Sequence, residues 1–207
     1  MKKLFLSASF SDVASLFPKF AREEMTAKKV CFIPTASIVE EYTGHVVNDK
    51  KAFQNLGVQI YELEISTATI ERITESLDAC DYIFVSGGNT FYLLQELKNK
   101  NVDQLIVKEI NKGKIYIGTS AGSIVMAPDI QYIETMDDRT KARNLPCTTG
   151  LNLIDYYPLV HYKSFPFTEV ADNIFDTYHK QLPLLTLSNQ EVLLVTDNHI
   201  EKQLISY

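Results

Sequence analysis

Residues 114–126 read KIYIGTSAGSIVM, and this stretch decides the fold. The apolar run Lys114–Ile117 predicts a buried strand, and an apolar helix start follows the residues GTSAG. Gly-x-Ser-x-Gly between a strand and a helix is typical of a nucleophile elbow, a strained turn that exposes its serine. Because the turn is sharp, side chains at Gly118 and Gly122 would clash with neighbouring backbone. We therefore expect Ser120 to project from the tip of this turn as a nucleophile.

Two backbone N–H groups are candidates for binding an oxyanion beside this serine. The N–H of Ala121 lies at the start of the expected helix, where the dipole and the unpaired N–H groups favour negative charge. A second turn, SGGNT at residues 86–90, directly follows the buried run Tyr82–Val85. Its glycines allow a close approach of the backbone, so the N–H of Gly88 can supply the second donor.

The same turn carries two polar residues with two possible roles. Asn89 or Thr90 can cap the helix that follows, and both are also candidate substrate-binding residues. A phosphate-binding loop is disfavoured here, because the chain contains neither GxGxxG nor the GxxxxGK pattern of a P-loop.

Outward from these turns, the chain alternates β-rich runs with amphipathic stretches. The expected strands are Leu4–Ala8, Lys29–Ile33, Val58–Leu63, Tyr82–Val85 and Lys114–Ile117. The expected helices are Val13–Glu24 (imperfect, because it contains Pro18), Tyr42–Leu56, Thr69–Ala79, Thr90–Leu97 and Val102–Lys112. This order predicts an α/β protein with a mainly parallel sheet between two helical layers, a three-layer α/β/α arrangement.

The C-terminal part has a different pattern. Leu184–Leu187, Glu191–Thr196 and Ile200–Ile205 are expected strands with little between them, and Asp197-Asn198 predicts a tight turn and an antiparallel hairpin. Residues 128–158 are irregular and are interpreted as a long surface loop with short strands. No repeat or linker is visible, so one domain over residues 1–207 is expected.

In a parallel sheet all strands end at one edge, where ligands bind. Ser9, Thr35, Gly88 and Ser120 each follow an expected strand, so all four are expected at that edge. A nucleophile and a second donor loop on one edge are what acyl transfer requires.

Composition narrows the class of protein. The 207 residues are 45% hydrophobic and carry a net charge of −6, which argues against a nucleic-acid binder with a basic face. Three cysteines without a CxxC spacing predict no disulfide framework and a reducing compartment, so we expect a cytoplasmic protein. No apolar run is long enough to span a membrane. No metal or other cofactor is expected, because HExxH and paired metal-ligand spacings are absent.

A serine nucleophile needs a base, and the chain has four histidines. His45 and His179 lie within helical patterns and are expected at the surface, and His199 lies in the expected hairpin turn. His161 follows an apolar run downstream of the elbow, which makes it the best candidate by elimination.

Taken together, SGGNTF at residues 86–91 and IGTSAG at residues 117–122 resemble peptidase family S51, which contains the aspartyl dipeptidases (peptidase E) and the cyanophycinases. The resemblance extends from residue 4 to His161. It implies a fold like that of the class I glutamine amidotransferases, a flavodoxin-like arrangement, with a serine at the elbow. By position it gives Ser120 as nucleophile, His161 as catalytic histidine, and Gly88 and Ala121 as the oxyanion-hole positions.

The chain departs from the dipeptidases in two ways. Where they carry the aspartate of the triad, it has Thr135, with Glu134, Asp137 and Asp138 nearby. One of these acids can orient His161, or a backbone carbonyl or a water does so and leaves a dyad.

The segment after His161 also differs from the dipeptidase pattern. A preference for N-terminal Asp, which the resemblance implies, needs a cation or several N–H donors. The candidate cations are Arg139, Lys141, Arg143 and Lys163.

Three functions follow from these residues. The favoured one is a serine peptidase acting on short peptides, including dipeptides with N-terminal Asp, as a monomer or homodimer. The others are a serine esterase or amidase on the same site, and a non-catalytic binding protein. A glutamine amidotransferase is disfavoured, because its elbow nucleophile is a cysteine and none of the three cysteines lies on such a turn.

Overall fold

A seven-stranded sheet runs through the centre of the computed structural model, which describes residues 1–205. The sheet order is β3-β2-β4-β5-β1-β8-β9, and the first five strands are parallel. β8 pairs antiparallel with both β1 and β9. The strands are β1 (Lys3–Ser7), β2 (Lys29–Ile33), β3 (Gln59–Glu62), β4 (Tyr82–Val85), β5 (Ile115–Thr119), β8 (Glu191–Thr196) and β9 (His199–Leu204).

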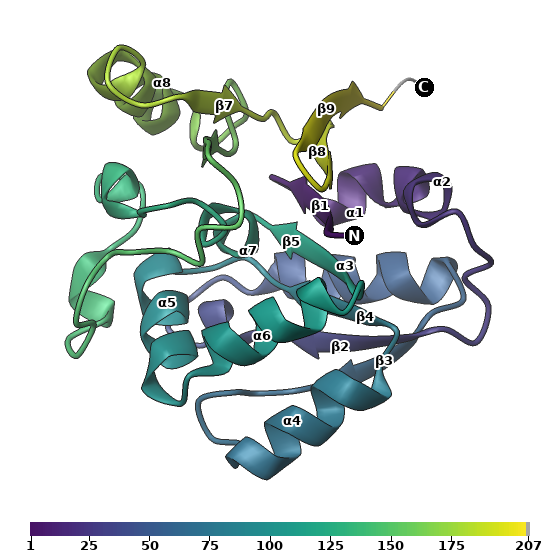
Figure 1. The fold of residues 1–207 in the computed structure, drawn as a ribbon. Helices are drawn as coiled ribbons and strands as arrows, with labels where there is room; N and C mark the ends of the chain where they lie inside the picture. Colours follow the sequence, from purple (N-terminus) through teal and green to yellow (C-terminus); the bar gives the residue numbers. More distant parts are fainter. Residues whose placement is uncertain (206–207) are drawn as a thin grey trace.

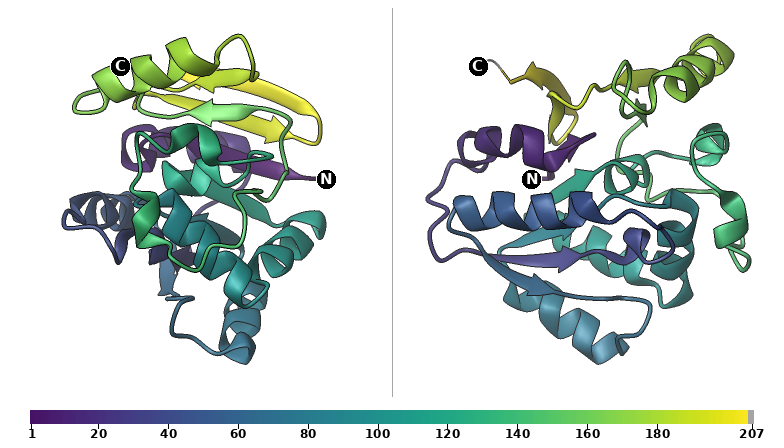
Figure 2. Two further views of the ribbon diagram at one scale, coloured as in Figure 1. Left: turned by 90° about the vertical axis from the view of Figure 1, so that its left-hand side faces the viewer. Right: turned by 180° about the vertical axis from the view of Figure 1, so that it is seen from behind.

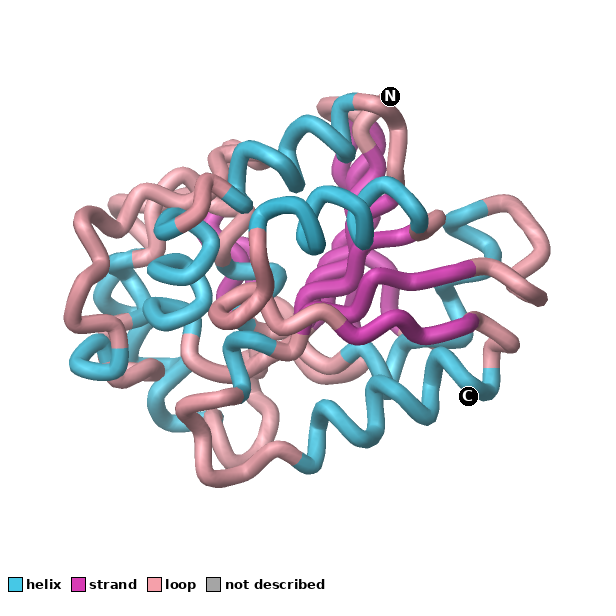
Figure 3. Tube along the Cα trace, turned by 90° about the horizontal axis from the view of Figure 1, so that it is seen from below, coloured by secondary structure: helices cyan, strands magenta, loops and turns pink. Residues whose placement is uncertain are grey.

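Helices cover both faces of this sheet (Figure 3). Figure 1 looks onto α4 (Ile70–Ala79), α5 (Thr90–Asn99) and α6 (Val102–Asn111). The view from behind in Figure 2 looks onto α1 (Phe10–Val13), α2 (Phe17–Ala21) and α3 (Gly44–Asn55). Of the remaining helices, α7 (Ala121–Ile124) follows the elbow, and α8 (Thr168–Tyr178) lies in the chain between the two strands of the small sheet described below.

The alternation of side chains along the strands explains the two layers. In β1, Leu4 and Leu6 pack into the apolar cluster beneath α4–α6, whereas Phe5 packs into the cluster beneath α1–α3. Successive side chains of a strand point to opposite faces, so a strand buried on both sides must be apolar throughout. The second cluster is rich in phenylalanine, and the rings of Phe10 and Phe53 stack at 4.5 Å between centroids. The expected three-layer fold is confirmed.

The C-terminal hairpin is also confirmed, with Asp197 at a positive φ of 51° in the turn between β8 and β9. The expected strand Leu184–Leu187 is present as β7 (Leu184–Thr186), but it lies outside the main sheet. It pairs in parallel with β6 (Tyr157–Leu159), which ends the irregular region. These two strands form a separate small sheet.

Two other expectations are adjusted. The helix expected over 13–24 is split into α1, a 3₁₀ turn at Ala14–Leu16 and α2, with Pro18 in the first turn of α2, where its missing N–H is tolerated. The single domain over 1–207 stays a prediction, and its last two residues lie outside the described residues. Within residues 1–205, no helix combines the length and the apolarity needed to cross a bilayer.

Candidate active site

The turn after β5 holds Ser120 in a strained conformation. Its backbone angles are φ 49° and ψ −112°, a region that residues with a side chain rarely adopt. The Ser120 N–H donates to the carbonyl of Ser7 at 2.9 Å. One turn later the Ser123 hydroxyl donates to Ser7 at 2.7 Å and to Gly118 at 2.9 Å, so the start of α7 is bound to the ends of β1 and β5.

The glycines of the elbow are required by close backbone approach. A Cβ at Gly118 would lie 2.5 Å from the carbonyl oxygen of Gly122, and a Cβ at Gly122 would lie 2.1 Å from that of Val85. A side chain at either glycine would therefore clash with the backbone, as expected from the sequence. The elements β4, β5 and α7 can meet only if both positions lack a side chain.

We expect Gly122→Ala to lower the free energy of unfolding by about 3 kcal/mol, because the methyl group meets rigid backbone rather than a side chain that can turn away. Gly44→Ala is the matched control, since the three atoms nearest to its methyl all belong to the side chain of the exposed Tyr42, which can turn away. Urea unfolding of both variants measures the difference. Equal midpoints would contradict the packing argument.

His161 lies against the serine. Its Nε2 is 3.0 Å from the Ser120 Oγ, and its Nδ1 is 2.7 Å from the Oδ1 of Asn189. The imidazole ring stacks on Phe167 with 4.6 Å between centroids. Because an amide oxygen only accepts, Nδ1 carries the proton and donates it to Asn189, which leaves the Nε2 lone pair facing the serine hydroxyl.

The small sheet places the histidine and its partner together. His161 follows β6 and Asn189 follows β7, and the two strands are paired in parallel. The N–H of Tyr162 donates to the carbonyl of Leu187 at 2.9 Å. The N–H of Asn189 donates to the Ser164 hydroxyl at 3.1 Å, which ties the two turns to each other.

Burial lowers the pKa of His161 below its usual value near 6.5, and the bond to Asn189 opposes this only in part. The imidazole is therefore neutral at pH 7, as a general base must be.

The acids near Thr135 do not reach His161. Glu134 pairs with Arg139 at 2.7 Å, and Asp138 accepts from the Thr140 N–H at 2.9 Å. Asp137 Oδ2 accepts from the Thr90 N–H at 2.8 Å. Asn189, a residue that the sequence analysis missed, takes the place beside the histidine.

The turn at residues 86–90, which carries the second candidate oxyanion donor, packs closely against Ala36 through Gly88. Gly88 has φ 133°, and a Cβ there would lie 2.2 Å from the carbonyl oxygen of Ala36. Within residues 1–205, the N–H groups of Gly88 and Ala121 donate to no other group of the protein. Both remain available to an oxygen bound beside the serine.

The helical pattern predicts His45 at the surface, but the structure places this side chain in the cleft. It lines the same cleft as Ser120, and its Nε2 lies 3.2 Å from the carbonyl oxygen of Gly87. Because that oxygen can only accept, Nε2 carries a proton and donates it. The peptide that ends in the Gly88 N–H is thereby held at its carbonyl end.

The polar residues of the turn at 86–90, Asn89 and Thr90, form hydrogen bonds within the protein. Asn89 caps α5, with its side-chain oxygen accepting from the Tyr92 N–H at 2.9 Å and its amide donating to the carbonyl of Asp138 at 3.0 Å. The expected cap is confirmed. Asn89 and Thr90 are buried and are not among the residues that line the cleft.

A cleft of about 450 Å³ lies at the carboxyl ends of the parallel strands. Ser9, Gly88 and Ser120 line it as expected, whereas Thr35 does not and donates to Glu64 at 2.9 Å. The other lining residues come from the segment after β1, from α3 and the loop before it, from the turn after β4, from the end of β5, from α7 and the loop after it, and from the turn that carries His161: Ala8, Glu40, Tyr42, His45, Asp49, Gly87, Thr119, Ile124, Met136, Asp137, Phe165, Pro166 and Phe167.

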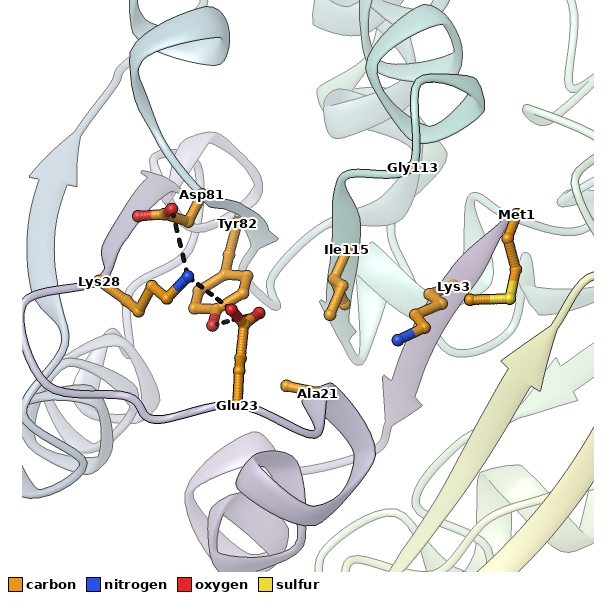
Figure 4. A pocket seen from close by; sticks show the side chains of 9 residues that line it. All are labelled: Met1, Lys3, Ala21, Glu23, Lys28, Asp81, Tyr82, Gly113 and Ile115. Atoms are coloured by element: carbon orange, nitrogen blue, oxygen red, sulfur yellow. Dashed lines mark hydrogen bonds and ion pairs between the residues drawn. The ribbon is translucent and has the colours of Figure 1, made fainter.

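A second cavity lies at the opposite ends of the strands (Figure 4). Its polar groups bind one another: Lys28 pairs with Glu23 at 2.5 Å and with Asp81 at 3.7 Å, and the Tyr82 hydroxyl donates to Glu23 at 3.0 Å. It offers no serine beside a histidine, so the cleft at Ser120 is the candidate active site.

Comparison with known proteins finds relatives that match nearly the whole chain. The model of peptidase family S51 matches residues 4–203. An uncharacterized peptidase of Pasteurella multocida is 47% identical over 197 residues, which cover 95% of each chain. A peptidase E of a Nostoc species is 28% identical over 200 residues, covering 94% of this chain and 78% of the relative.

Among solved structures, a candidate peptidase E from Listeria monocytogenes superposes with a TM-score of 0.95 at 44% identity and covers all of both chains. A peptidase from an acI-B1 actinobacterium shares the fold, with a TM-score of 0.71 at 18% identity over all of this chain and 88% of the other.

Proposed function

This chain belongs to peptidase family S51, and on that premise we propose that it is a serine peptidase hydrolysing short peptides, dipeptides included, with Ser120 as nucleophile and His161 as base. The observation that carries the proposal is the 3.0 Å contact between Ser120 Oγ and His161 Nε2 on a strained elbow. We place the activity in the cytoplasm, because all three cysteines are free thiols.

The chemistry is acyl transfer. As Ser120 Oγ attacks the peptide carbonyl, its proton passes to Nε2 of His161, and the carbonyl oxygen gains the negative charge. The N–H groups of Gly88 and Ala121 bind that oxyanion. The protonated His161 then gives its proton to the leaving amine as the C–N bond breaks. Water, deprotonated by the same histidine, releases the acyl group from the serine.

Two residues hold this arrangement without entering the reaction. The Asn189 Oδ1 accepts a hydrogen bond from the Nδ1–H of His161 and so fixes the tautomer of the imidazole. His45 donates to the Gly87 carbonyl and so fixes the peptide whose N–H is that of Gly88.

A dipeptide library tests the proposal directly. We expect the wild-type chain to release free amino acids and to be labelled by a serine-reactive phosphonate at Ser120. Turnover of esters without any peptide cleavage would replace the peptidase by an esterase, and no labelling together with no turnover would indicate a binding protein.

The resemblance implies a preference for N-terminal Asp, which needs a cation in the cleft to pair with the carboxylate of the substrate. Within residues 1–205, no lysine or arginine lines the cleft. Arg139 is paired with Glu134, and Lys163 lies over the ring of Tyr162 at 5.3 Å. We therefore leave the aspartyl preference out of the proposed function.

We expect Asn189→Ala to lower kcat about 10²-fold at unchanged KM, because the imidazole loses the acceptor that orients it. Ser188→Ala, one residue earlier in the same turn, is the control for local disturbance. Steady-state kinetics on one dipeptide measures both. A proportionate loss in both variants would indicate a structural role for Asn189.

Asn189→Asp tests the charge of this site. A carboxylate 2.7 Å from Nδ1 favours the imidazolium, so it raises the pKa of His161 by about one to two units. At a given pH less of the base is then neutral, and the acid limb of kcat/KM moves to higher pH. In the wild type that limb lies below pH 6.5, as the lowered pKa of His161 requires. Profiles between pH 4.5 and 9 compare the two, and coincident acid limbs would contradict the assignment of His161 as base.

A further inference from the structure

The candidate cleft is lined, within residues 1–205, by acidic side chains without a lysine or arginine. Among the described residues, its acidic side chains are Glu40, Asp49 and Asp137, and no lysine or arginine balances them. The other ionisable residues that line the described part of the cleft are Tyr42, His45 and His161. Of these, His161 is neutral at pH 7, because burial lowers its pKa. The electrostatic field of these groups favours a cation in the cleft.

Asp49 is the most informative of the three. It lies on α3, one turn after His45, and is 2% exposed. Its Oδ1 accepts from the Ser11 N–H at 3.2 Å, but its Oδ2 has no hydrogen-bond partner among residues 1–205. A buried carboxylate oxygen without a donor is costly, so a donor arriving with the substrate stabilises it. Burial raises the pKa of Asp49 to about 8, so the carboxyl is mostly protonated at pH 7 when no cation is bound, and a cation bound beside it favours the charged form.

Glu40 and Asp137 also line the cleft and are close enough for their charges to interact. The charge of Glu40 adds to the burial that raises the pKa of Asp137 to about 6. The carboxylate of Glu40 has no ion-pair partner within the described part of the chain. A positive group between the two would relieve their repulsion.

Two exposed aromatic side chains border the same cleft. Tyr42 is 73% exposed and Phe165 is 90% exposed, and both line it. Aromatic rings can contact the methylene stem of a long basic side chain and attract its charged end.

We propose that the cleft selects peptides with a positive charge on a residue flanking the scissile bond, held by Asp49 with Glu40 and Asp137. This inference rests on the proposed peptidase function and specifies its substrate class. The shared chemistry is an ammonium or guanidinium group, supplied by a lysine or arginine side chain or by a free α-amino terminus. An aspartyl side chain would enter among three carboxyl groups with no cation to pair with, so it is disfavoured.

Matched dipeptides separate the two sources of charge. Lys-Ala is compared with norleucine-Ala, Ala-Lys with Ala-norleucine, and Asp-Ala is measured beside them. Each of the four neutral or basic substrates is also tested with an acetylated N-terminus. For a side-chain cation we expect kcat/KM at least tenfold higher for lysine than for norleucine, with or without acetylation. For the α-ammonium we expect lysine and norleucine to be equal, and acetylation to lower kcat/KM at least tenfold.

Asp49→Asn tests the named carboxylate. It keeps the oxygen that accepts from Ser11 and removes the carboxyl group that can ionise beside a bound cation, so we expect the preference for the cationic substrate to fall at least tenfold through KM, with kcat nearly unchanged. Glu75→Gln, an exposed acid on α4 outside the cleft, removes the same charge as a control. Loss of the preference in both variants would assign it to net charge and overturn the proposed role of Asp49.

The inference fails if norleucine, lysine and aspartate substrates are cleaved equally, whether acetylated or not. It is separable from the proposed function through calorimetric binding of Lys-Ala, norleucine-Ala and acetyl-norleucine-Ala to the Ser120→Ala variant. If no peptide is cleaved by the wild type but the charged peptides bind and acetyl-norleucine-Ala does not, the peptidase proposal is wrong and the cation site stands. Equal binding, or no binding, of all three overturns the cation site.

Discussion

Ser120→Ala is expected to abolish peptide hydrolysis, with kcat lower by about 10⁶-fold, while the protein keeps its fold. Removing the nucleophile of a serine–histidine unit leaves the base with nothing to activate, and losses of this order are typical of such units. At about 1.4 kcal/mol for each factor of ten, the loss is about 8 kcal/mol of transition-state stabilisation. The side chain removed is small, and its Oγ contacts the histidine rather than the core.

The measurement is single-substrate kinetics on the best dipeptide, with circular dichroism to verify the fold. Ser76→Ala, on α4 and outside the cleft, is the matched serine control and should retain full activity. Wild-type turnover by the Ser120→Ala chain would remove Ser120 from the mechanism. The same variant should also lose labelling by a serine-reactive phosphonate.

His161→Ala should reduce kcat by nearly as much, and the double variant Ser120→Ala/His161→Ala should be no slower than either single variant. The two residues act as one unit, because the serine is a poor nucleophile without the base, and the later proton transfers of the base depend on the acyl group that the serine carries. The residual rate over water then comes from the N–H groups of Gly88 and Ala121.

Comparing the three rates measures this coupling. Losses that multiply in the double variant would show that Ser120 and His161 act independently, and the proposed proton transfer between them would be wrong. Imidazole added to His161→Ala provides a second readout, since a diffusible base should restore part of the activity and should do nothing for Ser120→Ala.

The parallel part of the fold could be predicted because its strands carry a strong local signal. Tyr82–Val85 and the run before Gly118 are apolar throughout, which is typical of strands buried on both faces. The turn residues of the hairpin at Asp197-Asn198 are equally local. The pairing of β7 was not predictable in this way, because three residues such as Leu184–Thr186 can join either sheet and only tertiary packing decides.

Contacts that depend on tertiary packing also explain which site residues the sequence did not reveal. Ser120 and Gly88 follow strands that were predicted to run parallel in one sheet, so their positions at one edge could be predicted as well. Asn189 follows β7, and without the pairing of β7 with β6 its nearness to His161 has no sequence signal. His45 belongs to a helix whose pattern is compatible with exposure, and its contact with Gly87 depends on how α3 lies against the edge of the sheet.

The placement of His161 and Asn189 on the small β6–β7 sheet separates activity from global stability. The nucleophile follows a strand of the large sheet, whereas the base and its acceptor follow two three-residue strands that pack against the same apolar cluster through Leu159 and Leu187. Cooperative units of unequal size open with unequal free energies. A local opening that moves this small unit away breaks the serine–histidine contact and leaves the central sheet folded. Inactivation by heat or denaturant can therefore precede unfolding, and the catalyst can recover as soon as the small unit closes again.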